Sequence, residues 1–130
     1  MIVVDASALL EVLLNTPDAD RVSGRLFGSG DTLHVPQLLD LEVAQVLRRY
    51  AASGGLTAGR GAQALQDLTD LPLIRYPHDL LLPRIWELRN RLTAYDAAYV
   101  ALAEALEVPL VTRDVALAGA RGHSATVELL

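Results

Sequence analysis

The sequence contains neither cysteine nor lysine, and each absence excludes whole classes of chemistry. Without cysteine there can be no disulfide, no thiol nucleophile and no thiolate metal site. All eleven basic residues are arginine, so nucleotide binding through a P-loop lysine and Schiff-base catalysis also lose their central residue. Any bound metal must therefore be held by oxygen or imidazole ligands.

Positive charge and long apolar runs are scarce as well. A formal net charge of -5 argues against a protein that coats nucleic acid through its overall potential, although a local groove lined by arginine remains open. No apolar stretch approaches the roughly 20 residues that span a bilayer, and the first residues read as a strand rather than as a basic targeting segment. We therefore expect a cytoplasmic protein with no membrane partner.

Apolar residues, by contrast, are abundant and alternate between strand and helix patterns. They make up 52% of the 130 residues, which is enough for one well-buried core, and we expect a single domain over residues 1–130. The expected strands cover residues 2–4, 32–35, 73–76, 108–112 and 126–129. The expected helices cover residues 6–14, 19–27, 36–52, 56–71, 80–92 and 97–107, with a short turn at 115–120. This order predicts an α/β fold with a mostly parallel central sheet of four to five strands flanked by helices.

Within the expected helix at residues 80–92, Pro83 falls in the opening turn, which proline tolerates because its missing N–H has no partner there. The apolar spacing places Ile85, Trp86 and Leu88 toward the core.

The first strand runs directly into a carboxylate. Residues 2–4 are all apolar, which indicates a strand buried on both faces of a parallel sheet, and Asp5 follows at its carboxyl end. In open α/β sheets this is the edge at which ligands bind. The alternative is that Asp5 only caps the helix that follows.

Three more acids occupy comparable positions. Glu42 lies on the edge of the apolar stripe of the expected helix at residues 36–52, which Pro36 would open; it either points into a cleft or leans into solvent. Asp96 opens the alanine-rich helix and could instead form a capping box with Thr93. Asp114 follows the fourth strand as Asp5 follows the first.

The topology brings these four acids to one edge of the sheet. Carboxylates gathered in one cleft repel one another unless protons or cations compensate the charge. Mg²⁺ or Mn²⁺ suits such all-oxygen coordination, and a bound divalent ion can activate water against a phosphodiester. The sequence therefore indicates a metal-dependent hydrolase of phosphodiester bonds.

The same residues resemble a known family. Residues 3–7 (VVDAS), Glu42, residues 92–97 (LTAYDA) and residues 110–114 (LVTRD) are similar in order and spacing to the motifs of PIN-domain ribonucleases. More narrowly, the chain resembles the VapC toxins of toxin–antitoxin pairs over essentially its whole length.

The resemblance implies a function and a set of partners. The expected activity is that of a Mg²⁺- or Mn²⁺-dependent endoribonuclease that cuts RNA such as tRNA or rRNA, is neutralised by a VapB-like antitoxin and forms a homodimer. Carried over by position, the catalytic and metal-binding residues are Asp5, Glu42, Asp96 and Asp114. The resemblance assigns Ser7 and Thr112 a supporting role through hydroxyl hydrogen bonds.

The basic and imidazole side chains are less informative. Arg113, Arg89 and Arg91 could contact RNA phosphates, or could form a solvated face and surface salt bridges. The three histidines show no close pairing and lie outside the acid motifs, which argues against a ribonuclease that uses two histidines.

Two other classes of function remain open. One is a hydrolase or phosphotransferase with Asp5 as nucleophile, although the chain lacks a second Asp beside Asp5 and any lysine. The other is a catalytically inactive PIN-like module that binds protein or RNA and uses the acidic cleft to receive an arginine from its partner.

Overall fold

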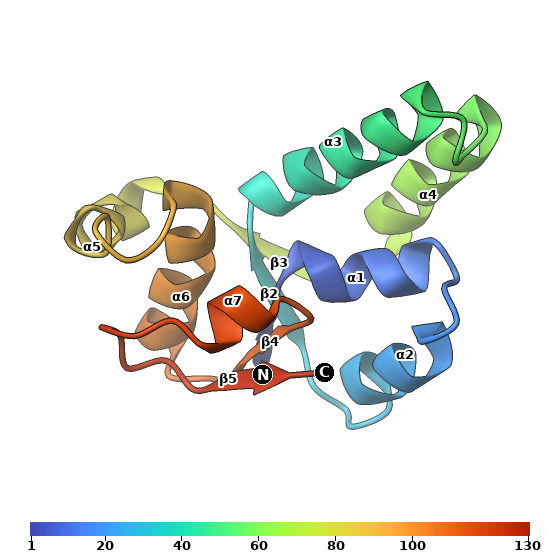
Figure 1. Cartoon of the computed structure of the whole chain (residues 1–130). Helices are drawn as coiled ribbons and strands as arrows, with labels where there is room; N and C mark the ends of the chain where they lie inside the picture. Colours follow the sequence, from blue (N-terminus) through green and yellow to red (C-terminus); the bar gives the residue numbers. More distant parts are fainter.

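A sheet of five parallel strands runs through the middle of the protein, in the order β3-β2-β1-β4-β5 (Figure 1). The computed structural model describes all residues from 1 to 130. The strands are β1 (Ile2–Val4), β2 (Leu33–Pro36), β3 (Leu73–Tyr76), β4 (Leu110–Thr112) and β5 (Val127–Leu129). All four neighbouring pairs are parallel. The predicted α/β fold with a mostly parallel sheet is therefore confirmed, and the terminal segment does form the fifth strand.

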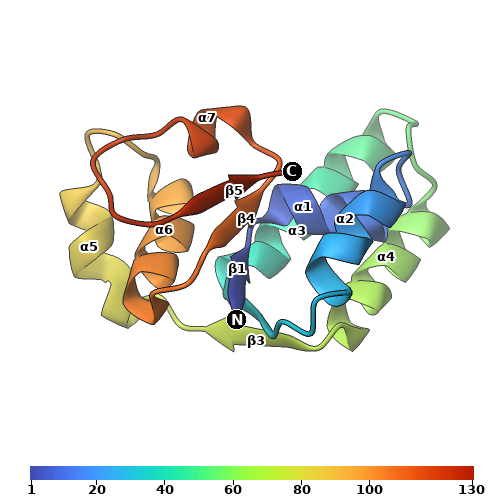
Figure 2. The ribbon, with the colours of Figure 1, turned by 90° about the horizontal axis from the view of Figure 1, so that it is seen from below.

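Helices cover both faces of this sheet. They are α1 (Ala6–Leu13), α2 (Ala19–Phe27), α3 (Leu38–Ala52), α4 (Ala58–Asp70), the 3-10 turn η1 (Asp79–Leu81), α5 (Leu82–Glu87), α6 (Ala94–Leu106) and α7 (Val115–Ala118). Helices α1 to α4 lie on one side of the sheet, and α5 and α6 lie on the other, in both views (Figures 1 and 2). None of these helices has both the length and the apolar character needed to cross a membrane.

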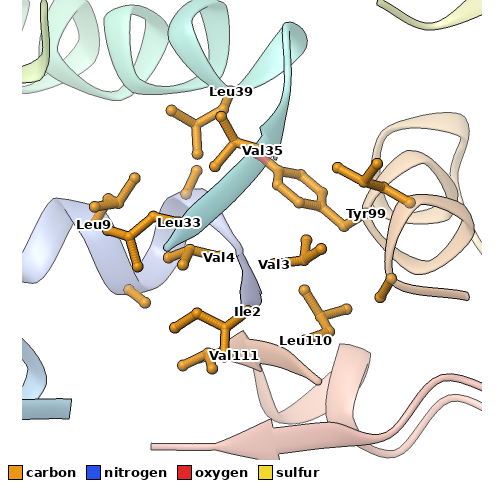
Figure 3. Close-up of a cluster of buried hydrophobic side chains, with 14 of the residues drawn as sticks. Ile2, Val3, Val4, Leu9, Leu33, Val35, Leu39, Tyr99, Leu110 and Val111 are labelled. Atoms are coloured by element: carbon orange, nitrogen blue, oxygen red, sulfur yellow. The ribbon is translucent and has the colours of Figure 1, made fainter. Parts of the chain in front are cut away.

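Strand β1 is the centre of the core. It pairs with β2 on one edge and with β4 on the other, and its side chains Ile2, Val3 and Val4 are buried. Figure 3 shows these side chains among those of α1, α3, β4 and α6. The alanines of α6 allow the helix to pack closely on the sheet, and residues 97–103 are all buried. The apolar pattern at residues 2–4 was therefore interpreted correctly as a strand covered on both faces.

The expected helix at residues 80–92 is wrong in its extent and in one of its core residues. The segment forms η1 and then α5, which ends at Glu87. Leu88 is buried as expected, but Trp86 is 68% exposed. The short α5 packs on α6, and residues two positions apart on a helix point in different directions, so Trp86 faces solvent while Leu88 is buried.

Pro36 does not open a helix but is the last residue of β2, paired with Tyr76 of β3. The backbone N–H of Gln37 donates to the Tyr76 carbonyl at 2.9 Å, so pairing with β3 continues past a residue that has no N–H. Helix α3 begins at Leu38, and its first N–H donates to Nε2 of His78 at 3.0 Å. A loop residue forty positions later in the chain therefore caps the helix that carries Glu42.

His34 is a buried imidazole on β2, next to the edge strand β3. It is 3% exposed, and its ring nitrogens are hydrogen-bonded to the Thr32 hydroxyl and the Tyr76 hydroxyl, both at 2.8 Å. Burial lowers the pKa of His34 below its ordinary value of 6.5, and the positive charge of the chain's amino terminus lowers it further.

This lowered pKa predicts a loss of stability in mild acid. The unfolded imidazole takes up a proton near pH 6.5 while the folded one resists it, so this contribution is complete above pH 6.5 and falls as the pH drops below it. We expect the free energy of unfolding to fall more steeply from pH 7.5 to 5.5 in the wild type than in His34→Gln. The extra slope is limited to about 1.4 kcal/mol per pH unit. Urea denaturation at each pH measures it; parallel curves for the two proteins would contradict the prediction.

Candidate active site

Asp5 is a buried carboxylate at the carboxyl end of the central strand. It is 6% exposed, and its Oδ2 accepts hydrogen bonds from the hydroxyls of Ser7 at 2.6 Å and Thr112 at 2.8 Å. It occupies the N-cap position of α1, but its side chain makes no capping hydrogen bond. The explanation of Asp5 as a helix cap therefore fails, and Oδ1 is left without a hydrogen-bond partner within the chain.

The two hydroxyls that hold Asp5 are themselves held by the backbone. Ser7 Oγ accepts from the N–H of Arg113, and Thr112 Oγ1 accepts from the N–H of Asp114, both at 2.9 Å. A carboxylate oxygen can only accept, so each hydroxyl donates its single hydrogen to Oδ2 of Asp5 and accepts the backbone N–H through a lone pair. Asp5 is thus fixed by one donor from α1, the helix that follows it, and by one from the neighbouring strand β4.

Glu42 extends from α3 toward α6, where its Oε1 accepts a hydrogen bond of 2.6 Å from the hydroxyl of Tyr99. Burial raises the pKa of Glu42; the hydrogen bond from Tyr99 opposes this, and the negative charges of Asp5 and Asp96 add to it. Glu42 is therefore directed toward the other acids and does not simply lean into solvent. Sequence reasoning missed Tyr99, although its position three residues after Asp96 places both side chains on one face of α6.

Asp96 lies in the first turn of α6, but capping does not explain its carboxylate. Thr93 is the N-cap, and its hydroxyl accepts from the Asp96 N–H at 3.2 Å, so the helix begins at Ala94 rather than at the expected residue 97. The reciprocal bond of a capping box is absent. Burial raises the pKa of Asp96, and the charges of Asp5 and Asp114 raise it further.

Asp114 is the acid with the clearest structural role. It caps α7, and its Oδ1 accepts from the backbone N–H groups of Ala116 at 2.9 Å and Leu117 at 3.3 Å. Its Oδ2 accepts no hydrogen bond, so it can cap the helix and still present one oxygen to a cation.

The four acids share one electrostatic environment at the carboxyl edge of the sheet. The charges of Asp5 and Asp96 raise the pKa of Glu42, and the charges of Asp5 and Asp114 raise the pKa of Asp96. No three carboxylates or imidazoles, however, are already close enough to enclose a metal ion. The free oxygens and mutual repulsion fit an open site for a hard divalent cation whose remaining ligands are water or substrate, as is usual for Mg²⁺.

Arg113 is occupied by ion pairs on the far side of α1. Its Nη2 lies 2.7 Å from Oδ2 of Asp18 and 3.6 Å from Oε1 of Glu11, and Nη1 donates to the Leu130 carbonyl at 3.2 Å. A phosphate could reach this guanidinium only by displacing the two carboxylates.

Arg89 and Arg91 are exposed, and neither forms an ion pair. The guanidinium of Arg89 stacks over the ring of Trp86, 4.5 Å from its centroid, and Arg91 runs alongside Gly122. Both remain accessible, but they lie in the segment that follows α5 rather than among the acids.

The remaining comparison is with known proteins. Residues 2–122 match the PIN domain family. The chain belongs to this family. The PIN domain thus covers all four acids, and the motifs at residues 3–7, 92–97 and 110–114 fall inside it.

Among PIN-domain proteins, this chain is similar to curated VapC ribonucleases of Mycobacterium tuberculosis. Ribonuclease VapC9 is 51% identical over 117 residues, which are 90% of this chain and 88% of that protein. Ribonuclease VapC12 is 40% identical over 130 residues, which are 100% of this chain and 99% of that protein.

Solved structures share the PIN fold at lower identity. VapBC2 from Rickettsia felis, crystallised with a DNA fragment from its promoter, superposes with a TM-score of 0.71 at 14% identity and covers 99% of this chain and 98% of that chain. At this identity the likeness shows the arrangement of helices and strands alone.

The repulsion within the PIN-domain acid site predicts that removing one charge stabilises the metal-free protein. Because the folded state raises the pKa of Glu42, its ionised form disfavours folding above that pKa. Glu42→Gln retains an acceptor for Tyr99 and should raise the free energy of unfolding, because it removes a charge that burial and the neighbouring acids disfavour. Denaturation by urea at pH 7.5 in a chelating buffer measures the change.

Glu104→Gln is the matched control, for which we expect the opposite change in the free energy of unfolding. Hydrogen bonds from Arg84 lower the pKa of Glu104 to about 2, so its charge favours folding. Its neutralisation should cost about 2 kcal/mol, as for hydrogen bonds to a charged group. A loss of stability in both variants would show that Glu42 is not in a repulsive site.

Proposed function

We propose that this PIN-domain protein is a VapC-type endoribonuclease that hydrolyses phosphodiester bonds in RNA with the help of Mg²⁺ or Mn²⁺. The observation that carries the proposal is the convergence of four carboxylates at the carboxyl edge of the sheet, with raised pKa values at Glu42 and Asp96. Relatives with 40–51% identity that are named VapC ribonucleases support the choice of RNA as substrate.

The ligands of the cation would be Asp5, Glu42, Asp96 and Asp114. When bound, a divalent ion activates water and offsets negative charge on the phosphate. The chain's own contribution is to orient the carboxylates: Ser7 and Thr112 fix Oδ2 of Asp5, and the first turn of α7 fixes Oδ1 of Asp114. Each of these acids then offers its second oxygen.

The histidines support water, rather than a side chain, as the nucleophile. His34 is hydrogen-bonded to the hydroxyls of Thr32 and Tyr76, His78 accepts from the first N–H of α3, and His123 accepts from the N–H of Ala125. None is hydrogen-bonded to an acid of the site. The chain also offers no cysteine or lysine nucleophile.

The proposed partners are an RNA substrate and a VapB-like antitoxin that blocks the acidic site, and we place the activity in the cytoplasm. A groove of about 770 Å³ beside Glu42 supports a binding partner at this position. It is lined by apolar side chains such as Leu38 and Tyr95 and by the arginines at positions 48 and 49.

We also propose a homodimer, because large apolar side chains are exposed near the start of α3 and along η1 and α5. Leu80 is 85% exposed, Leu41 75% and Leu82 55%. The hydrogen bond from Leu38 to His78 brings these two regions of the chain together. Contiguous exposed apolar surface on a soluble domain is typical of a protein interface.

Cleavage of RNA tests the proposed activity directly. Purified protein, free of antitoxin, should make discrete cuts in total cellular RNA when Mg²⁺ or Mn²⁺ is present, and a chelator should abolish them. Asp5→Asn should lower the rate by more than about a hundredfold, the upper end of the loss when only a hydrogen-bond partner of a metal ligand is removed. Sequencing of the new RNA ends measures the cuts.

Asp67→Asn serves as a control, because Asp67 lies on α4 and is hydrogen-bonded to Gln63 rather than to the site. It should cut as the wild type does. Wild-type cutting by a folded Asp5→Asn protein would overturn the catalytic assignment. A folded wild type that is inert toward all RNA tested would favour the inactive binding module.

The homodimer predicts a mass in solution of twice that of the chain. Leu80→Glu should shift the protein toward the monomer, because a buried charge at an interface is not compensated. Val115→Glu, at another exposed apolar residue on α7, should leave the dimer intact. Light scattering after size exclusion measures the masses; a monomeric wild type at micromolar concentration would refute the dimer.

A further inference from the structure

The most deeply buried polar group beside the acid site is the phenol of Tyr99. Its side chain is 0% exposed and belongs to the apolar core, and Val3 lies on the same side of β1 as the ring (Figure 3). The ring reaches from α6 toward the carboxyl end of β2. A ring packed on all sides has one position, so the hydroxyl is held rigidly in space.

This hydroxyl has one side-chain partner, Oε1 of Glu42, at 2.6 Å. A phenol has a donor hydrogen and a carboxylate oxygen can only accept, so the Tyr99 hydroxyl donates to Glu42. A short bond from a neutral hydroxyl to a carboxylate is among the stronger hydrogen bonds in proteins.

Glu42 needs such a contact more than the three aspartates do. A glutamate has an additional rotatable bond, and Leu41 beside it is 75% exposed, so this part of α3 faces solvent. Fixing a long side chain in one rotamer costs conformational entropy. A rigid donor on the neighbouring helix supplies the compensating interaction.

The pattern at Glu42 repeats the pattern at Asp5. In each carboxylate one oxygen accepts from protein hydroxyls, Oδ2 of Asp5 from Ser7 and Thr112 and Oε1 of Glu42 from Tyr99, while the other oxygen accepts no hydrogen bond. A carboxylate anchored through one oxygen presents the other in a defined direction. Partners of this kind orient metal ligands and tune their affinity.

We propose that Tyr99 is a positioning residue of the acid site: its hydroxyl anchors Oε1 of Glu42 and directs Oε2 toward the cation. The inference rests on the proposed function, because it assumes that the acids bind a divalent ion. Tyr99 acts through Glu42 and does not touch the substrate. Loss of the hydroxyl therefore weakens cation binding through one carboxylate and leaves the other three unchanged.

Binding of Mn²⁺ to the free protein tests this without RNA. Electron paramagnetic resonance of the unbound ion gives the dissociation constant at pH 7.5. Tyr99→Phe should raise it about tenfold, within the range expected for loss of a hydrogen bond to a metal ligand. In a Glu42→Ala background the same substitution should change nothing further, because the residue through which Tyr99 acts is gone.

Tyr76→Phe is the matched control. It also removes a phenol hydroxyl from a hydrogen bond, here 2.8 Å to His34, but at a site that touches none of the acids. Both variants should unfold at a lower temperature than the wild type, whereas only Tyr99→Phe should bind Mn²⁺ more weakly. In the cleavage assay, Tyr99→Phe should need more Mn²⁺ for half-maximal rate while its KM for RNA stays unchanged.

The outcomes separate the inference from the proposed function. Equal Mn²⁺ affinity in Tyr99→Phe, Tyr76→Phe and the wild type would show that Tyr99 only stabilises the fold, and would overturn the inference alone. An additional loss from Tyr99→Phe in the Glu42→Ala background would overturn action through Glu42. No Mn²⁺ binding by the folded wild type would overturn the metal-dependent function, and the inference with it.

Discussion

The acid site depends on the parallel pairing of β1 with β2 and β4. This pairing buries Ile2, Val3 and Val4 on both faces and ends the central strand at Asp5. Because all strands run in the same direction, the segments that follow them leave the sheet at one edge. Helix α6, which returns to β4, must begin at that edge as well. One topological constraint thus concentrates negative charge that the chain would otherwise spread along 110 residues.

Hydrogen bonds donated by hydroxyls stabilise and orient these concentrated carboxylates. Burial penalises the ionised carboxylates, as the raised pKa values of Glu42 and Asp96 show. Ser7, Thr112 and Tyr99 return part of that free energy by donating to one oxygen of an acid. These three donor residues belong to three different elements, α1, β4 and α6. The geometry of the acids therefore depends on the packing of the whole core.

The same dependence extends to the start of α3, which carries Glu42. Its first N–H is capped by His78 from the loop after β3, and the preceding Pro36 completes β2. The position of Glu42 is therefore set by the pairing of β2 with β3 as well as by Tyr99. The positions of the acids are set mainly by residues distant in the sequence. This is usual at sites whose chemistry requires preorganised side chains.

The sequence by itself determined the class of fold and the identity of the acids. Uninterrupted apolar runs such as residues 2–4 cannot have a solvent face, and their alternation with helical patterns leaves a parallel sheet as the consistent solution, so Asp5 and Asp114 could be placed at one edge. Predictions from the local sequence pattern were wrong where contacts with distant residues decide the structure. Trp86 has the spacing of a core residue but is exposed, and Pro36 has the features of a helix start but completes a strand. The resemblance to a known family already implied that the hydroxyls of Ser7 and Thr112 support the acids. Only the tertiary structure decided that Tyr99 meets Glu42, because this hydrogen bond joins residues 57 positions apart and no periodicity along the chain encodes such a contact.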